Sequence, residues 1–99
     1  MEKRTPQTRL HIVKTMVRAG LTAITRSALI GAAQMGFCSR QEIFDVILTL
    51  EPADFYKSMT AHHDHTCWHD VYRTVYNGQQ IYIKFIVTDG VLVVSFKEL

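Results

Sequence analysis

Two turn dipeptides constrain the fold of this chain more than any other feature. Asn77-Gly78 and Asp89-Gly90 each separate segments in which apolar and polar residues alternate. Asn-Gly and Asp-Gly favour two-residue hairpin turns, because their central positions take positive φ angles. The chain therefore predicts three antiparallel strands at residues 69–76, 80–88 and 91–97. A further, less regular strand is expected at residues 54–61.

A two-residue turn also fixes which residues stand opposite each other. The first turn pairs Arg73 with Tyr82, and the second pairs Tyr82 with Lys97, so these three side chains form one row on one face. The other predicted pairs are Tyr76–Gln79, Val75–Gln80 and Val71–Lys84 in the first hairpin, and Thr88–Val91, Ile86–Val93 and Lys84–Ser95 in the second.

The two faces of the predicted sheet differ in polarity. One face is apolar and must meet the helices; its members are Ile81, Ile83, Phe85, Val87, Leu92, Val94 and Phe96. The opposite face holds the Arg73–Tyr82–Lys97 row, with Lys84 and Ser95 beside it. Alternation along residues 69–76 adds His69 to this face. If the chain stays extended further back, Cys67, His65 and His63 join it.

The first half of the chain predicts helices. The first begins with Thr5 as N-cap and Pro6 at the first helical position, and it ends at Gly20. The second lies between its N-cap Thr25 and Gly36, where a glycine favours a helix end.

A third helix is predicted from a capping box of Ser39 and Glu42. Its apolar positions have the spacing of one helix face and are Ile43, Val46, Ile47 and Leu50, and Pro52 ends it. Helices followed by an antiparallel sheet of at least three strands predict an α+β fold, with about three N-terminal helices packed on one face of the sheet.

Length and charge limit the organisation. Ninety-nine residues allow one domain, over residues 1–99. No apolar segment is long enough for a membrane span, no signal peptide is expected, and two cysteines do not make a disulfide framework, so a reducing cytoplasm is expected. The net charge is +2, but residues 2–26 carry six basic side chains against one acid. This asymmetry favours a polyanionic partner or an ordinary solvated helix face.

The polar face of the sheet has the chemistry of metal-free RNA cleavage. Arginine and lysine bind phosphate oxygens, whereas tyrosine and histidine can transfer protons or stack on bases. In that reaction the ribose 2′-OH attacks the adjacent phosphorus, and no cofactor is required. The alternatives are an ordinary solvent-facing sheet surface and a non-catalytic RNA-binding or protein-interaction module.

The histidine-rich segment at residues 62–70 raises the alternative of a zinc site. Ligands at alternate positions of one strand lie along a line and do not close a tetrahedron, so we expect no metal site. Cys67 beside histidines also raises the alternative of a nucleophilic cysteine, but nothing here supplies an activating group. We expect Cys38 and Cys67 to be small packing residues.

Several segments of the chain resemble the motility quorum-sensing regulator toxins. They are Glu2-Lys3-Arg4-Thr5-Pro6 with Thr8-Arg9-Leu10, Thr25-Arg26-Ser27-Ala28-Leu29, Asp54-Phe55-Tyr56-Lys57-Ser58-Met59-Thr60, Asp64-His65-Thr66 with Trp68, Asp70-Val71-Tyr72-Arg73, and Val94-Ser95-Phe96-Lys97-Glu98. The resemblance implies a RelE-like fold and the toxin half of a type II toxin–antitoxin pair. It further implies ribosome-independent cleavage of mRNA at GC-containing triplets such as GCU, and silencing by an antitoxin (MqsA-like) that binds operator DNA.

The resemblance also implies site residues. Lys57, Tyr82 and Lys97 match the positions usually held responsible for cleavage, and His65 and Arg73 match positions also implicated. Three of these are the row that the hairpin register already predicts. One departure is His69, since the family commonly has glutamine there; histidine can keep the hydrogen-bonding role or add a general acid or base. Lys84 and Ser95 complete the candidate set, as RNA-binding residues.

Overall fold

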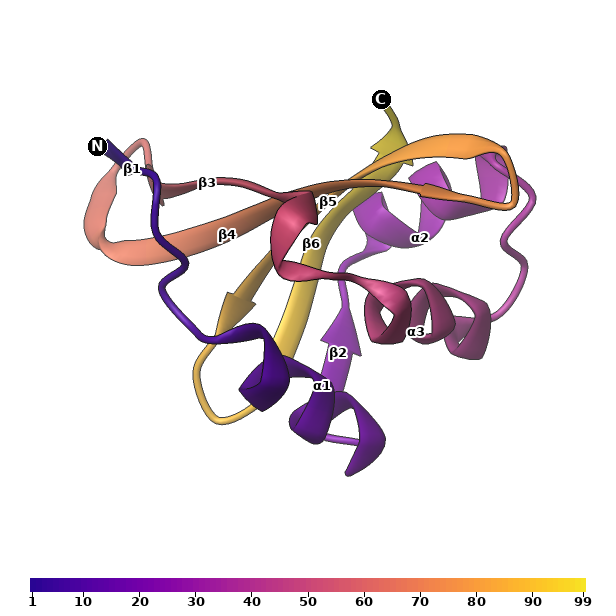
Figure 1. Cartoon of the computed structure of the whole chain (residues 1–99), viewed down its shortest axis with the longest axis horizontal. Coiled ribbons are helices and arrows are strands. Elements are labelled where there is room, and N and C mark those ends of the chain that lie inside the picture. The colour runs from indigo at the N-terminus through magenta and orange to yellow at the C-terminus, as the bar shows by residue number, and fades with distance from the viewer.

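The computed structural model describes all of residues 1–99 and has two layers, three helices against one face of a six-stranded sheet (Figure 1). In chain order the elements are β1 (Glu2–Lys3), α1 (Leu10–Arg18), β2 (Thr22–Ile24), α2 (Arg26–Gln34), α3 (Arg40–Thr49), the 3-10 helix η1 (Pro52–Asp54), β3 (Phe55–Ala61), β4 (Asp64–Tyr76), β5 (Gln79–Val87) and β6 (Val91–Glu98). The sheet order is β1-β3-β4-β5-β6-β2, and only β2 runs parallel to its neighbour. The predicted α+β class is confirmed. None of the helices is long and apolar enough to cross a membrane.

One apolar core joins the helices to the sheet. Ile81, Ile83 and Phe85 of β5 are fully buried in it, as predicted. The three helices contribute Val13, Val17, Ala28, Ala32, Ile43, Val46 and Ile47. Because every helix packs into this one cluster, the opposite face of the sheet has no helix over it.

The caps of α2 and α3 are confirmed. The Thr25 hydroxyl accepts a hydrogen bond from the Ala28 amide, and the Ser39 hydroxyl accepts one from the Glu42 amide. The Glu42 carboxylate reaches back to the Cys38 amide, one residue before the expected partner. These caps satisfy amide groups that lack a partner within the first helical turn.

The predicted start of the first helix is wrong. The helix α1 begins at Leu10, and Thr5 and Pro6 lie in an irregular connection that precedes it. The buried Asp70 carboxylate accepts hydrogen bonds from the amides of Gln7 and Thr8, at 2.9 and 3.0 Å. These two bonds hold the connection against the sheet and compete with helix formation there.

The first predicted hairpin is confirmed. Asn77 and Gly78 have φ angles of 50° and 78°, as a two-residue turn of this type requires. All four predicted pairs between β4 and β5 occur, including Arg73 opposite Tyr82.

The second predicted turn is wrong in detail. Val87 pairs with Val91, so the loop holds three residues, and Gly90 does not have a positive φ. A bulge at Val94 then restores the predicted register, with Lys84 opposite Ser95. The shift places Val91 and Val93 in the core instead of Leu92 and Val94, which are half-buried.

The sheet is wider than predicted. The strand at residues 55–61 is confirmed as β3, and β4 begins at Asp64, five residues before the predicted start. The short edge strands β1 and β2 were not predicted. They extend the sheet on both sides, β1 beside β3 and β2 beside β6.

Candidate functional site

The uncovered face of the sheet carries the predicted row. Arg73 of β4 stands opposite Tyr82 of β5, and Tyr82 stands opposite Lys97 of β6. The Lys97 ammonium nitrogen lies 5.0 Å from the centre of the Tyr82 ring. Three adjacent strands therefore bring two cations and one phenol together, since directly opposed side chains in a sheet are near neighbours.

A second row runs beside the first. Lys57 of β3, Val71 of β4, Lys84 of β5 and Ser95 of β6 are opposed in turn across the sheet. Val71 is fully buried at the centre of this row. It gives the two lysines an apolar floor.

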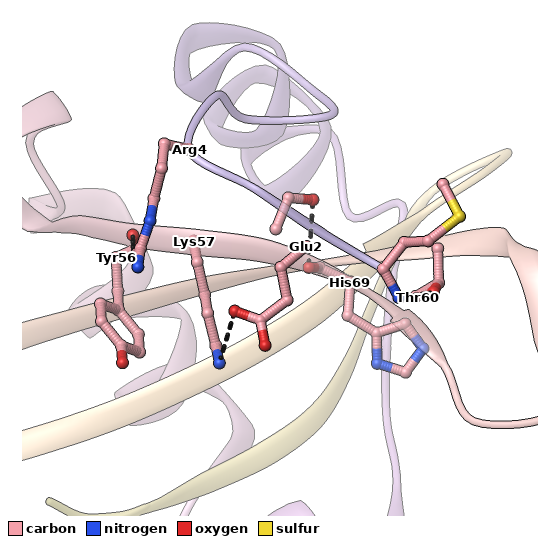
Figure 2. Close-up of polar contacts among 8 residues, drawn as sticks. Glu2, Arg4, Tyr56, Lys57, Thr60 and His69 are labelled. Atoms are coloured by element: carbon pink, nitrogen blue, oxygen red, sulfur yellow. Dashed lines mark hydrogen bonds and ion pairs between the residues drawn. The ribbon is translucent and has the colours of Figure 1, made fainter.

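A bulge in β3 adds a residue that strand alternation does not predict. The register shifts between Phe55 and Lys57, so Tyr56 is the extra residue. Tyr56 and Lys57 are therefore sequence neighbours that point to the same side of the strand, as Figure 2 shows. Phe55 turns to the other face, where its ring contacts the Tyr72 ring edge-on.

Tyr56 supports the predicted Arg73. The guanidinium carbon of Arg73 lies 3.6 Å from the centre of the Tyr56 ring. Stacking on an aromatic face holds a guanidinium in one plane while leaving its N–H groups free to bind an anion. Tyr56 was not among the predicted site residues. It reaches the face of Arg73 only because of the bulge, and no sequence pattern predicts that bulge.

Lys57 has an acidic partner from the N-terminal strand. Its ammonium nitrogen lies 3.1 Å from a Glu2 carboxylate oxygen, and this is the only ion pair in the chain (Figure 2). The Lys57 side chain is mostly covered, whereas Glu2 is about half exposed. Glu2, a second residue that the sequence did not predict, is therefore the one acid in contact with the cations of this face.

The electrostatics of the face follow from clustering and burial. Burial lowers the pKa of Lys84, and the nearby charges of Lys97 and Lys57 lower it further. Burial raises the pKa of the Tyr82 hydroxyl, an effect that Lys57 partly opposes and Tyr56 reinforces. Tyr82 therefore keeps its proton at neutral pH, and the lysines form a site for an anion.

His69 lies on this face, as predicted, opposite Met59 of β3. Burial lowers the pKa of His69, and the positive charge of Lys84 lowers it further. The imidazole is therefore neutral near pH 7 and can accept a proton.

His65 lies apart from the rows. Ala61 pairs with Asp64 and Thr60 pairs with Trp68, so residues 65–67 form an irregular insertion at the tip of the β3–β4 hairpin. The Asp64 carboxylate binds the amide and hydroxyl of Thr66, which closes this tip locally. His65 is exposed there. The extended strand considered for His63, His65 and Cys67 includes His65 and Cys67, which belong to β4, but not His63, which lies in the turn.

The structure contains no group of three or more His, Cys, Asp or Glu side chains placed to hold a metal ion. The cationic face offers a different kind of site. Lys57, Arg73, Lys84 and Lys97 surround a phenol and a neutral imidazole, and this arrangement can bind a phosphate and transfer protons to and from it.

Comparison with known proteins agrees with this chemistry. A family model described as "Motility quorum-sensing regulator, toxin of MqsA" matches residues 5–98. The mRNA interferase toxin MqsR of Escherichia coli (strain K12) is 51% identical over 98 residues, covering 99% of each chain.

Proposed function

The chain belongs to the motility quorum-sensing regulator toxin family, and from that membership we propose that it is an mRNA interferase whose active site is the cationic face of the sheet. The observation that carries the proposal is the row of Arg73, Tyr82 and Lys97, which three strands place side by side. Residues 1–99 act as one toxin domain with a RelE-like fold.

The cations bind the scissile phosphate. Arg73, held flat by Tyr56, and Lys97 contact its non-bridging oxygens and stabilise the negative charge that builds up as phosphorus becomes five-coordinate. When the Lys57 ammonium group separates from Glu2, it binds the scissile phosphate or the next phosphate along the RNA. Lys84 and Ser95, in the adjacent row, hold the RNA backbone beside it.

The protons move through the two neutral groups. The ribose 2′-OH attacks phosphorus while neutral His69 takes its proton, and the bond to the 5′ oxygen of the next nucleotide breaks. Tyr82, which is protonated at neutral pH, supplies a proton to that leaving oxygen. The products are a 2′,3′-cyclic phosphate and a 5′-hydroxyl, and no cofactor takes part. His65, at the exposed hairpin tip, serves RNA binding by stacking on a base outside the reacting phosphate.

Family membership supports the biological setting that we propose. The protein is the toxin of a type II toxin–antitoxin pair. The toxin cleaves mRNA at GC-containing triplets such as GCU, and it needs neither the ribosome nor a metal ion. Cleavage stops translation and growth under stress and alters biofilm formation. A cognate DNA-binding antitoxin neutralises the toxin, their complex binds operator DNA, and both act in the cytoplasm.

RNA cleavage in the presence of chelator tests the proposal. The purified chain is incubated with a long mRNA in EDTA, and new 5′ ends are mapped beside Lys97→Ala and a matched Arg40→Ala control, because Arg40 is an exposed cation at the start of α3. We expect discrete cuts with wild type and Arg40→Ala that disappear with Lys97→Ala. Folded protein that makes no cuts would favour a non-catalytic RNA-binding module, and equal cutting by Lys97→Ala would remove the assigned role.

A further inference from the structure

A pocket of about 480 Å³ lies on the helix side of the sheet, where the proposed reaction does not use it. It is lined by Pro6, Arg9, Leu10, His11, Lys14, Pro52, Phe55 and Tyr72. Its floor is aromatic and apolar, and its rim carries two permanent cations and a histidine. A volume of this size accommodates a small organic group such as a nucleobase with its sugar.

Tyr72 lies at the floor of the pocket, where its ring packs edge-on against the ring of Phe55. Its side chain is fully buried, so the floor of the pocket is apolar. The polar groups that a ligand can reach are therefore those of the rim, Arg9, His11 and Lys14.

The pocket shares a wall with the active site. Phe55 lines the pocket, whereas the next residue, Tyr56, stacks on Arg73 in the site. Adjacent Cα atoms are about 3.8 Å apart, so only the thickness of β3 separates the two. β1 pairs only with Ser58 and Met59, so it leaves this part of the β3 edge unpaired.

Arg4 lies between the active site and the chain segment that leads to the pocket. Its guanidinium donates a hydrogen bond to the Tyr56 carbonyl at 3.3 Å and lies 5.6 Å from the centre of the Tyr56 ring. Figure 2 shows Arg4 reaching from the N-terminal segment to β3, with the Tyr56 ring on the far side. The same segment continues to the pocket residues Pro6 and Arg9. Cations therefore lie in the active site (Arg73), on the N-terminal segment beside β3 (Arg4) and at the pocket rim (Arg9 and Lys14).

We propose that this pocket binds a nucleotide of the substrate RNA that flanks the cleaved bond. The strand leaves the active site around the β3 edge along Arg4, and a base enters between the apolar side chains of the pocket. Arg9 and Lys14 bind the accompanying phosphate. The cations of the active site, the N-terminal segment and the pocket rim together favour RNA over an acidic peptide as the occupant. This inference rests on the proposed RNA cleavage.

Two RNAs built around one mapped cleavage site test the inference. The short RNA holds only the nucleotides next to the cut, and the extended RNA is about ten nucleotides longer, the size of one single-strand binding site. The measured quantity is the ratio of kcat/KM for the extended RNA to kcat/KM for the short RNA. The protein variants are Arg9→Ala, Lys14→Ala and the two combined. Arg18→Ala with Arg40→Ala is the charge-matched control outside the pocket.

We expect a wild-type ratio of roughly ten, since two charge-assisted contacts are at stake. The ratio should fall to near one in the Arg9 and Lys14 double variant, fall partway in each single variant and stay at the wild-type value in the control. All of these variants change exposed or half-buried side chains, so their folding is secure.

Two results would overturn the inference while leaving RNA cleavage intact. The first is a wild-type ratio of one. The second is a ratio that the pocket variants do not change, with binding of a glutamate–tyrosine copolymer that they abolish, because this would assign the pocket to an acidic peptide. Failure of wild type to cut either RNA would instead overturn the proposed function together with the inference.

Discussion

The two faces of the sheet are built from the same strands, yet they hold opposite kinds of side chain. Along β5, Ile81, Ile83 and Phe85 are fully buried beneath the helices, and Tyr82 and Lys84 between them face the active site. The helix-side face holds the apolar groups of the core. The other face gathers four cations around one acid, an arrangement that like-charge repulsion disfavours. Stability should therefore depend on one face, and activity on the other.

Removing the Tyr82 hydroxyl should have the largest effect. Tyr82→Phe keeps the ring beside Lys97 but removes the proton proposed for the leaving oxygen. We expect kcat to fall by about 10²–10⁴-fold, with an unchanged urea midpoint, because the hydroxyl has no hydrogen-bond partner in the fold. Single-turnover cleavage and urea unfolding check both statements. A rise in KM with unchanged kcat would instead make Tyr82 a base-stacking residue.

Truncating the neighbouring core position should reverse this pattern. Ile83→Ala leaves a cavity under the helices and should lower the free energy of unfolding by about 2–5 kcal/mol. Ile86→Ala is the matched control, because Ile86 lies on the same strand, pairs with Leu92 and is only half-buried. Urea unfolding of both variants measures the difference. Equal losses would show that the two faces do not differ in their contribution to stability.

Strand pairing could be predicted from the sequence where it depends on the backbone angles of two adjacent turn residues. Asn77 and Gly78 both take positive φ, so the turn and the Arg73–Tyr82 pair follow from two residues. Gly90 serves a different need: a Cβ there would lie 2.6 Å from the Leu21 carbonyl oxygen, so the glycine permits close approach of the α1–β2 loop. Both glycines lie in hairpin loops, but Gly78 is needed for the backbone angle of a two-residue turn and Gly90 is needed for packing within a three-residue loop.

The rest of the site depends on long-range structure that no local pattern records. The bulge at Val94 restores the Tyr82–Lys97 pair after a three-residue loop, so that pair was predicted correctly from a wrong turn. The bulge at Tyr56 and the two-residue strand that carries Glu2 are too short to have a periodicity. The expected helix start at Thr5 failed because Asp70, far along the chain, binds the segment after it.

A smaller, pH-dependent effect should come from His69. Its pKa is below the ordinary value of 6.5, so between these values the unfolded chain binds a proton that the folded chain does not. Stability therefore decreases as the pH falls through this window. Neutral His69 is also the proposed base, so wild-type kcat should fall at the lower end of this window, where the pH reaches the lowered pKa of His69 and the folded protein takes up the proton.

His69→Gln separates this titration from the other groups on the face. The variant should lose the acidic limb of the pH–rate profile and should have a lower kcat at neutral pH. Its unfolding midpoint should vary less between pH 5 and 7 than that of wild type, a range set by an ordinary histidine pKa of about 6.5. Superimposable pH–rate profiles for the two proteins would leave His69 with a hydrogen-bonding role alone.

The smallest effect should come from the one acid that touches the cationic face. Glu2 neutralises Lys57 across 3.1 Å, and a phosphate must compete with it. Glu2→Gln should lower KM for RNA by about two- to threefold at low salt and leave kcat unchanged, since a half-exposed ion pair contributes under about 1 kcal/mol. The gain should vanish at high salt, where screening weakens both contacts.

Asp89→Asn removes the same charge from the β5–β6 turn and is the control. If Asp89→Asn lowers KM as much as Glu2→Gln, the gain reflects net charge and not release of Lys57. The lower KM would then come from the net charge of the protein, and the Glu2–Lys57 ion pair would have no specific effect on RNA binding.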